Sequence, residues 1–152
     1  MDTRSTDHLI AAGEAIEKRV RLSREEIIAF ARISHDENPL HVDQRQAQRA
    51  RFGELIASGQ HTASILMGML ATHYSRSSDG VQREMLCLNM NFAFKEPVFA
   101  DQGLVLAWHV ASAEWNNKLH GVLAHLDGSA GVASGKPAVI ARGTILVKEG
   151  AA

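Results

Sequence analysis

The second half of the chain alternates between apolar and polar residues, which is the period-two pattern of a half-buried strand. The clearest run extends from Leu86 to Phe94, where an apolar side chain stands at every second position. Segments with strand character follow one another at residues 86–94, 104–113, 119–126 and 138–147. Short turns and a loop rich in Gly, Ser and Ala at 128–135 separate them, so we expect antiparallel pairing.

The first half of the chain has helical periodicity instead. A loosely alternating segment at 14–22 suggests a short edge strand. Ser23 and Glu26 then have the spacing of a capping box, at the start of a helix that runs to about Ser34. Asp43 is placed to cap a second, polar helix that ends at Gly53. A third helix, at about 59–74, is apolar on nearly all sides and is therefore expected to be buried.

These elements predict an α+β protein with a single domain over residues 1–152, in which residues 1–13 form a poorly ordered N-terminal segment. A long buried helix and one antiparallel sheet form a pair of layers, so a sheet of about five strands should curve around the helix. A chain of 152 residues is long enough to bury a stable core.

Composition and charge exclude several function classes. The formal net charge is −1 and the basic residues are not clustered, so nucleic acid is not the expected partner. No apolar run reaches the length of a bilayer span, and residues 1–12 lack the pattern of a secretory signal. We therefore expect a cytoplasmic protein without a membrane partner. The single cysteine, Cys87, excludes an internal disulfide and a cysteine zinc site.

The segment between the first two helices, Ser34-His35-Asp36-Glu37-Asn38-Pro39-Leu40-His41, carries the candidate chemistry. Pro39 fixes its own φ and pushes Asn38 toward extended backbone, so the segment should form a turn between helices. Such a turn holds Asp36 and His41 at fixed places. A purely structural turn is the alternative, because Asp and Asn commonly bond nearby backbone N–H groups. The spacing of the carboxylate and imidazoles matches no standard metal site.

This segment and its downstream sequence resemble the MaoC-like (R)-specific enoyl-CoA hydratases. The matching residues are Phe30-Ala31, Ser34, Asp36-x-Asn38-Pro39-Leu40-His41-x-Asp43, Ala47, Phe52-Gly53 and Ile56-Ala57-Ser58-Gly59, with weaker matches at Phe94, Pro97-Val98 and Asp101. The resemblance covers residues 14–148 and implies a hot-dog fold, in which an antiparallel sheet wraps a helix. The family usually has Gly where this chain has His35, and often has His-Gly where this chain has Ser58-Gly59.

The resemblance implies hydration of 2-enoyl thioesters, or the reverse dehydration of 3-hydroxyacyl thioesters. Asp36 and His41 would hold the attacking water, Asn38 would orient this pair or the loop, and the Gly59 N–H would bond the thioester oxygen. The remaining candidate substrate-binding residues are Ser58, His35 and Pro39. The substrate is then a thioester of CoA or of acyl carrier protein. A homodimer, or a higher assembly of dimers, is expected to act without a cofactor or a metal.

Two other functions stay open from the sequence. A hot-dog thioesterase also uses a carboxylate, but it releases free thiol. A non-catalytic subunit that binds acyl thioesters would have lost activity through the change from Gly to His35. The individual roles also have structural alternatives. Gly59 can be a plain helix cap, and Ser58 fits an N-cap better than a nucleophile because no Gly-x-Ser-x-Gly sequence surrounds it. Candidates for contact with carrier phosphates are Arg49, Arg51 and Lys95.

Overall fold

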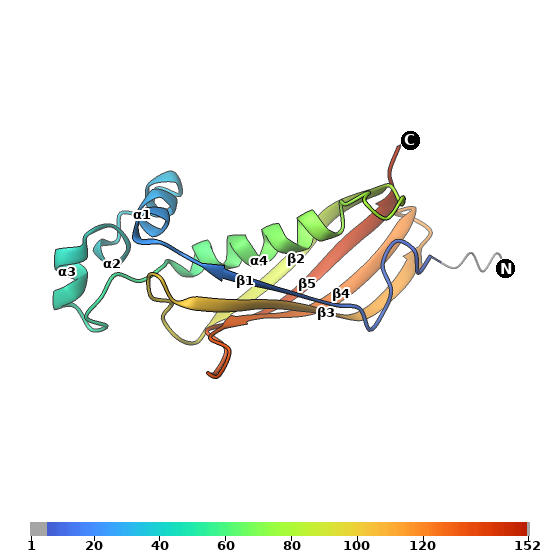
Figure 1. Cartoon of the computed structure of the whole chain (residues 1–152). Coiled ribbons are helices and arrows are strands. Elements are labelled where there is room, and N and C mark those ends of the chain that lie inside the picture. The colour runs from blue at the N-terminus through green and yellow to red at the C-terminus, as the bar shows by residue number, and fades with distance from the viewer. Residues whose placement is uncertain (1–5, 152) are drawn as a thin grey trace.

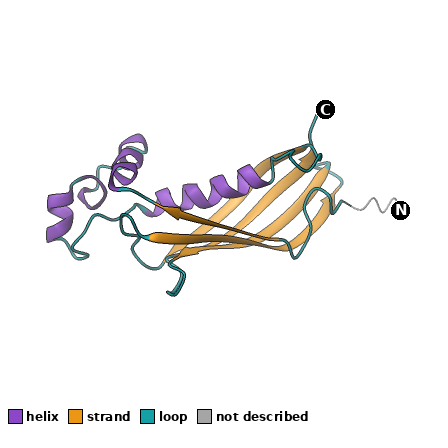
Figure 2. Cartoon of the chain, viewed as in Figure 1, coloured by secondary structure: helices purple, strands orange, loops and turns teal. Residues whose placement is uncertain are grey.

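The computed structural model describes residues 6–151, which form one curved sheet with a long helix along one face (Figure 1). The strands are β1 (Ala15–Arg21), β2 (Arg83–Phe94), β3 (Gly103–Asn116), β4 (Gly121–Gly131) and β5 (Val139–Glu149). The helices are α1 (Arg24–Ile33), α2 (Pro39–Val42), α3 (Gln44–Arg49) and α4 (Gly59–His73). Along the described chain, all the helices come after β1 and before β2. Figure 2 shows the long helix along the sheet and the shorter helices beyond one end of it.

The strands form one antiparallel sheet in the order β1-β3-β4-β5-β2. The last three strands are hairpin neighbours, whereas β2 lies beyond β5 and β1 lies beyond β3. β1 and β2 are therefore the two edges of the sheet. This arrangement confirms the α+β class and the curved five-stranded antiparallel sheet expected from the sequence.

The main core lies between α4 and the sheet. Leu66 and Leu70 of α4 are fully buried in one cluster with Leu106 and Trp108 of β3. The Trp108 indole N–H also donates to the Leu66 carbonyl oxygen at 2.9 Å, which ties the middle of α4 to the sheet. The expectation of a helix buried on all sides is correct only for the side that faces the sheet. Within this chain, the opposite side of α4 is exposed, at Ser64, Gly68 and Ala71.

A second apolar cluster fixes the small helices beside the N-terminal end of α4, where they extend away from the sheet (Figure 1). Ile27 of α1 and Ala47 of α3 are buried in it, together with Leu55 and Ala57 from the segment that enters α4. This cluster sets the position of the connection between α1 and α2 relative to α4. No helix in the described part of the chain is long and apolar enough to cross a membrane.

Two strands differ from their predicted form. The pairing of β2 with β5 shifts register between Cys87 and Asn89, so Leu88 is an extra residue and the alternation of 86–94 is interrupted. β4 continues to Gly131, through the first half of the expected loop at 128–135. The continuation pairs with β3 as far as Gly131 and with β5 as far as Ala130, and Gly128 leaves room for the Trp108 ring, from which a side chain there would lie 2.6 Å.

The N-terminal segment also differs from the expectation. Residues 1–5 lie outside the described part, but Leu9 and Ile10 are each only 1% exposed and belong to the main core. The buried Arg83 side chain donates to the carbonyl oxygens of His8 and Leu9 and holds this segment in place. The prediction of poor order was therefore wrong for residues 8–10, because their partner lies more than 70 residues away in the sequence.

Candidate active site

The C-terminal end of α1 directs the chain into the candidate site. The Asp36 N–H donates to the Ala31 carbonyl oxygen at 2.8 Å, and the His35 N–H donates to that of Arg32 at 3.2 Å. These two bonds define a Schellman ending, whose penultimate position is left-handed and favours glycine. His35 occupies that position with a φ of 59°. The geometry explains why the resembling family usually has Gly there, and it leaves the His35 side chain exposed.

A tight turn then links Asp36 to the one-turn helix α2. One carboxylate oxygen of Asp36, Oδ1, accepts from the Asn38 N–H at 3.1 Å, and the Asn38 side-chain oxygen caps α2 through the Leu40 N–H at 3.1 Å. Pro39 is the first residue of α2, where a missing N–H costs nothing. The expected non-helical loop is thus a helix at 39–42. Asn38 is a capping residue, and Pro39 is exposed.

His41 lies in α2 and is only 8% exposed. Its Nδ1 is 2.7 Å from the Ile56 carbonyl oxygen. A carbonyl oxygen can only accept, so Nδ1 carries the hydrogen and the neutral ring has its lone pair on Nε2. The Ile56 N–H in turn donates to the Leu40 carbonyl oxygen at 3.1 Å. These bonds fix both the tautomer and the direction of Nε2.

Nε2 of His41 points to Oδ2 of Asp36 across 3.9 Å. This distance is too long for a direct hydrogen bond, but one water oxygen can lie about 2.8 Å from both atoms. The Asp36 side chain is 23% exposed and that of His41 is 10% exposed, so the pair lies at the edge of solvent. The structure therefore brings Oδ2 of Asp36 and Nε2 of His41 close enough for both to contact one water.

The N-terminal end of α4 is the third part of the site. Ser58 is buried and caps the helix, because its Oγ accepts from the His61 N–H at 3.2 Å. As the first residue of α4, Gly59 has an N–H without a partner inside the helix. The Phe94 ring covers its α-carbon closely, since a side chain at Gly59 would lie 2.7 Å from two ring atoms. Phe94 itself is 55% exposed.

The first turn of α4 also contains contacts that the sequence analysis did not assign. The Gln60 side-chain amide donates to Asp36 Oδ2 at 3.0 Å, which joins α4 to the turn after α1. The ring of His61 stacks on Phe30 of α1, with ring centroids 4.3 Å apart. The only available signal for these contacts is the presence of polar residues directly after Gly59 in an otherwise apolar helix.

His61 and Thr62 contain buried polar atoms without a hydrogen-bond partner among the described residues, namely His61 Nδ1 and Thr62 Oγ1. Burial lowers the pKa of His61, and the nearby Glu26 carboxylate opposes this shift only in part. The neutral ring is therefore the favoured form at neutral pH.

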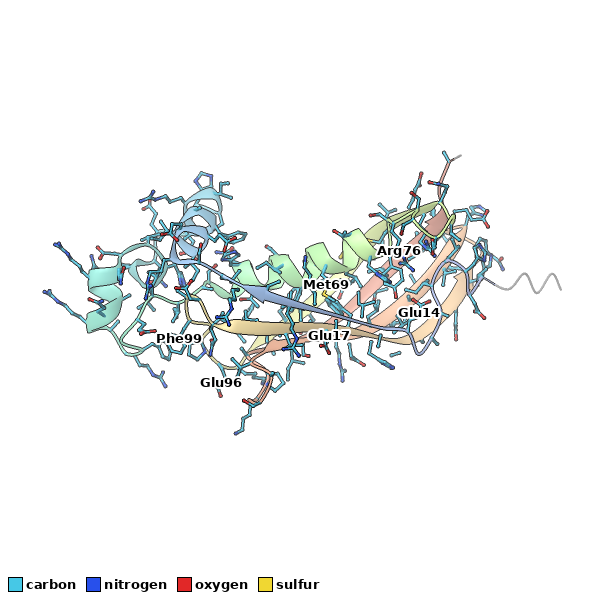
Figure 3. All side chains as sticks on the ribbon, viewed as in Figure 1. Glu14, Glu17, Met69, Arg76, Glu96 and Phe99 are labelled. Atoms are coloured by element: carbon cyan, nitrogen blue, oxygen red, sulfur yellow. The ribbon has the colours of Figure 1, made fainter. Side chains whose placement is uncertain are left out.

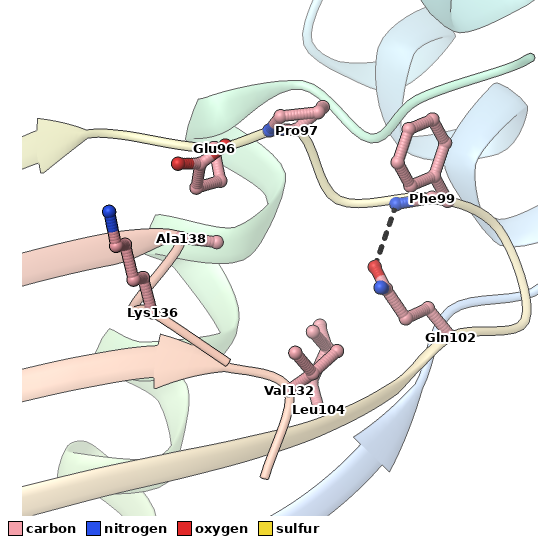
Figure 4. A pocket seen from close by; sticks show the side chains of 8 residues that line it. All are labelled: Glu96, Pro97, Phe99, Gln102, Leu104, Val132, Lys136 and Ala138. Atoms are coloured by element: carbon pink, nitrogen blue, oxygen red, sulfur yellow. Dashed lines mark hydrogen bonds between the residues drawn. The ribbon is translucent and has the colours of Figure 1, made fainter. Parts of the chain in front are cut away.

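The other candidate residues lie apart from the pair. Arg49 and Arg51 are exposed at the end of α3, where the Arg51 guanidinium lies over the Phe52 ring, and Lys95 is exposed after β2. A hollow of about 310 Å³ opens beside the β2–β3 connection, between that connection and the β4–β5 loop (Figure 4). It contains neither Asp36 nor His41. Among residues 6–151, no three His, Cys, Asp or Glu side chains are grouped to hold a metal.

The protein has a helix along a curved antiparallel sheet, which is the arrangement of a hot-dog fold. An Asp–His pair lies at the start of that helix. The family model described as "MaoC like domain" matches residues 10–130, and the chain belongs to this family. The sequence resemblance to MaoC-like proteins is thereby confirmed.

Named relatives agree with this assignment. The chain is 28% identical over 111 residues to a mitochondrial 3-hydroxyacyl-[acyl-carrier-protein] dehydratase of Arabidopsis thaliana, covering 72% of this chain and 62% of that protein. It is 30% identical over 90 residues to an (R)-specific enoyl-CoA hydratase of Aeromonas caviae, covering 59% of this chain and 63% of that protein. The chain thus spans about three fifths of the length of these relatives.

Solved structures show the same fold. The structure of an (R)-hydratase from A. caviae involved in PHA biosynthesis superposes with a TM-score of 0.77 at 25% identity, covering 93% of this chain and 98% of that one. A 3R-hydroxyacyl-ACP dehydratase complex, HadBC of Mycobacterium tuberculosis, superposes with a TM-score of 0.71 at 18% identity, covering 90% and 96%. The hot-dog fold expected from the sequence is confirmed.

Proposed function

We propose that this protein is an (R)-specific hydratase of 2-enoyl thioesters, which also catalyses the reverse dehydration of 3-hydroxyacyl thioesters. The observation that carries the proposal is the 3.9 Å separation of His41 Nε2 and Asp36 Oδ2, with both atoms able to accept a hydrogen from the same water. The family membership and the hydratases and dehydratases among the relatives give the reaction class.

In the proposed hydration, the water bound between Asp36 and His41 attacks the β-carbon of the enoyl thioester. The pair takes one proton from this water as its oxygen bonds to carbon, and the pair returns one proton to the α-carbon. Both the oxygen and the proton come from one side of the substrate, so the addition is syn. No electron is gained or lost by the substrate, so no redox cofactor enters the proposal.

The Gly59 N–H is the proposed donor to the thioester oxygen, on which negative charge develops during the attack. A free N–H at the start of a helix carries partial positive charge and suits such an oxyanion. The contact from Gln60, the neighbouring residue, to Asp36 supports this assignment because it places the first turn of α4 next to the water-binding pair. Ser58 contributes the cap that shapes this turn.

The experiment is an assay of the purified protein with short 2-enoyl-CoA thioesters, following the loss of enoyl absorbance. We expect Asp36→Asn and His41→Ala to lower kcat about a thousand-fold each, because each removes one of the two groups that hold and deprotonate the water. The exposed Asp127→Asn change on β4 is the matched control and should leave kcat unchanged. Near-normal turnover in either site variant would remove the assignment.

The same assay separates the other two functions. A thiol reagent detects the free CoA that a thioesterase releases, whereas hydration releases none. Binding of acyl-CoA without turnover, with activity gained in His35→Gly, would indicate a non-catalytic subunit. The His35 side chain lies exposed at a left-handed position, so this change should also relieve backbone strain of about 1 kcal/mol.

We also propose that the protein forms a homodimer through the β2 edge. β2 is a 12-residue edge strand that exposes Leu86, Leu88 and Phe94, beside the exposed Ile140 of β5. A long apolar edge strand is a template for pairing with a second chain. Light scattering should give twice the 16.5 kDa of one chain, and a mass of one chain would exclude the dimer.

A further inference from the structure

Gln60 makes the contact that joins the two halves of the candidate site. Its Nε2 lies 3.0 Å from Oδ2 of Asp36, although the two residues are 24 positions apart. An ionised carboxylate only accepts hydrogen bonds, so the amide nitrogen rather than the amide oxygen must face it. The same oxygen, Oδ2, is the one that faces His41. Gln60 therefore contacts the reacting side of the carboxylate.

The two oxygens of Asp36 are held by different parts of the chain. The local turn holds Oδ1 through the Asn38 N–H at 3.1 Å. This bond alone leaves Oδ2 free to swing, because the side chain is partly exposed and can be hydrated from solvent. The bond from Gln60 restrains rotation of the carboxylate and keeps Oδ2 directed toward His41 Nε2. It also sets the distance between the carboxylate and the first turn of α4, which contains the Gly59 N–H.

We propose that Gln60 is a positioning residue for the hydration reaction. It holds Asp36 Oδ2 in contact with the water and at a fixed distance from the Gly59 N–H. This inference rests on the proposed function. An amide suits the task because its N–H donates a hydrogen bond to the carboxylate oxygen. A carboxylate at this position would repel Asp36, and an apolar side chain would leave Oδ2 unrestrained.

The test is a series of variants at residue 60 in the full chain, assayed with a 2-enoyl-CoA under steady-state conditions. Gln60→Met keeps the length and removes the donor, and we expect kcat to fall about 10- to 100-fold because small displacements of a catalytic group have effects of this size. KM should change less than about two-fold, since ground-state binding is not affected. Gln60→Glu should lower kcat further than Gln60→Met, because two carboxylates then face each other.

A donor at this position should restore activity. Gln60→Lys returns an N–H donor at similar reach, and we expect its kcat to be at least about three-fold above that of Gln60→Met. The matched control is Gln82→Met, an exposed glutamine beyond the C-terminal end of α4, which should leave kcat unchanged. Thermal unfolding of all variants should lie close to that of the unchanged protein, because Gln60 is exposed.

The outcomes separate the two proposals. If the unchanged protein hydrates the substrate and Asp36→Asn does not, the proposed function is correct. Equal kcat in Gln60→Met and the unchanged protein would then overturn the positioning role alone. The role would also be overturned if Gln60→Lys were no more active than Gln60→Met, or if KM rose while kcat stayed constant. An unchanged protein without hydratase activity would overturn both proposals.

Discussion

The two ends of α4 differ in whether their buried polar groups have hydrogen-bond partners. At the C-terminal end, the Tyr74 hydroxyl donates to Glu14 Oε2 at 2.8 Å. The two residues are 60 positions apart in the sequence. Arg83 is buried beside them and donates to the carbonyl oxygens of Leu9 and His8 and to both carboxylate oxygens of Asp79. Glu14 and Arg76 mark this end in Figure 3.

The N-terminal end of α4 has buried polar atoms that no residue of 6–151 satisfies. His61 Nδ1 and Thr62 Oγ1 are buried without partners among the described residues. Asp36 Oδ2 and His41 Nε2 lie 3.9 Å apart, and the Phe94 ring against Gly59 is 55% exposed. Phe99 and Glu96 mark this end of the molecule in Figure 3.

This difference bears on what each end of α4 contributes to the free energy of folding. A buried donor or acceptor that is paired contributes to folding, whereas one that is unpaired costs free energy until a ligand or water binds it. Arg83 is paired, and its guanidinium also holds the pKa of Asp79 well below its usual range. The polar groups at the C-terminal end of α4 are therefore paired within the protein, whereas His61 Nδ1 and Thr62 Oγ1 at the N-terminal end remain available to a ligand or a water.

Arg83→Met is expected to have the largest effect on the free energy of unfolding, and it tests the comparison between the two ends of α4. The change leaves buried carbonyl oxygens without a donor, so the free energy of unfolding should fall by about 3 kcal/mol. The kcat of the folded variant should stay unchanged, because Arg83 lies at the other end of α4 from the candidate site. Urea unfolding and the hydratase assay, performed on the same preparation, measure both quantities.

Arg142→Met is the matched control for Arg83→Met. The Arg142 side chain is 84% exposed and lies 3.5 Å from Asp127 on the surface of the sheet, so its loss should cost less than about 1 kcal/mol. Equal losses in the two variants would show that the buried network is no more important than a surface ion pair. A fall in kcat for folded Arg83→Met would show that the two ends are not independent.

The local features of both ends were predictable from the sequence, and the long-range ones were not. The strands, the main helices, the capping box of Ser23 and Glu26, and the Asp36–His41 motif all depend on residues near one another in the chain. Periodicity and capping chemistry predict the strands and helices, whereas the roles of Asp36 and His41 were implied by the resemblance to the MaoC-like family. These features were enough to give the fold class and to indicate which residues form the candidate site.

The missed features depend on partners that are distant in the sequence. The bulge at Leu88 follows from the pairing of β2 with β5, and the extension of β4 to Gly131 follows from its pairing with β3 and β5. The contact of Gln60 with Asp36 and those of Arg83 with the N-terminal segment likewise join separate regions. A single sequence contains no local pattern for such pairs, because neither residue alone indicates which distant residue it will contact.

A smaller effect is expected in the pH dependence of the free energy of unfolding, through His61 at the N-terminal end of α4. Because burial lowers the pKa of His61, the unfolded chain takes up a proton below about pH 6.5 that the folded chain still excludes. The contribution of His61 therefore favours unfolding increasingly as pH falls from 6.5, until the folded ring also becomes protonated. Glu26 opposes the shift and makes it smaller.

His61→Leu removes this contribution together with the unpartnered Nδ1. At pH 7.5 the free energy of unfolding should lie within about 1 kcal/mol of that of the unchanged protein, since an unpaired polar group is replaced by an apolar one. Between pH 7.5 and pH 5.0 it should fall less steeply. The pKa of His73 is lowered by burial as well, but His73 is present in both proteins and cancels in the difference. Parallel falls would mean that folded His61 gains a proton as easily as the unfolded chain does, and that the first turn of α4 is open to water rather than held dry for a ligand.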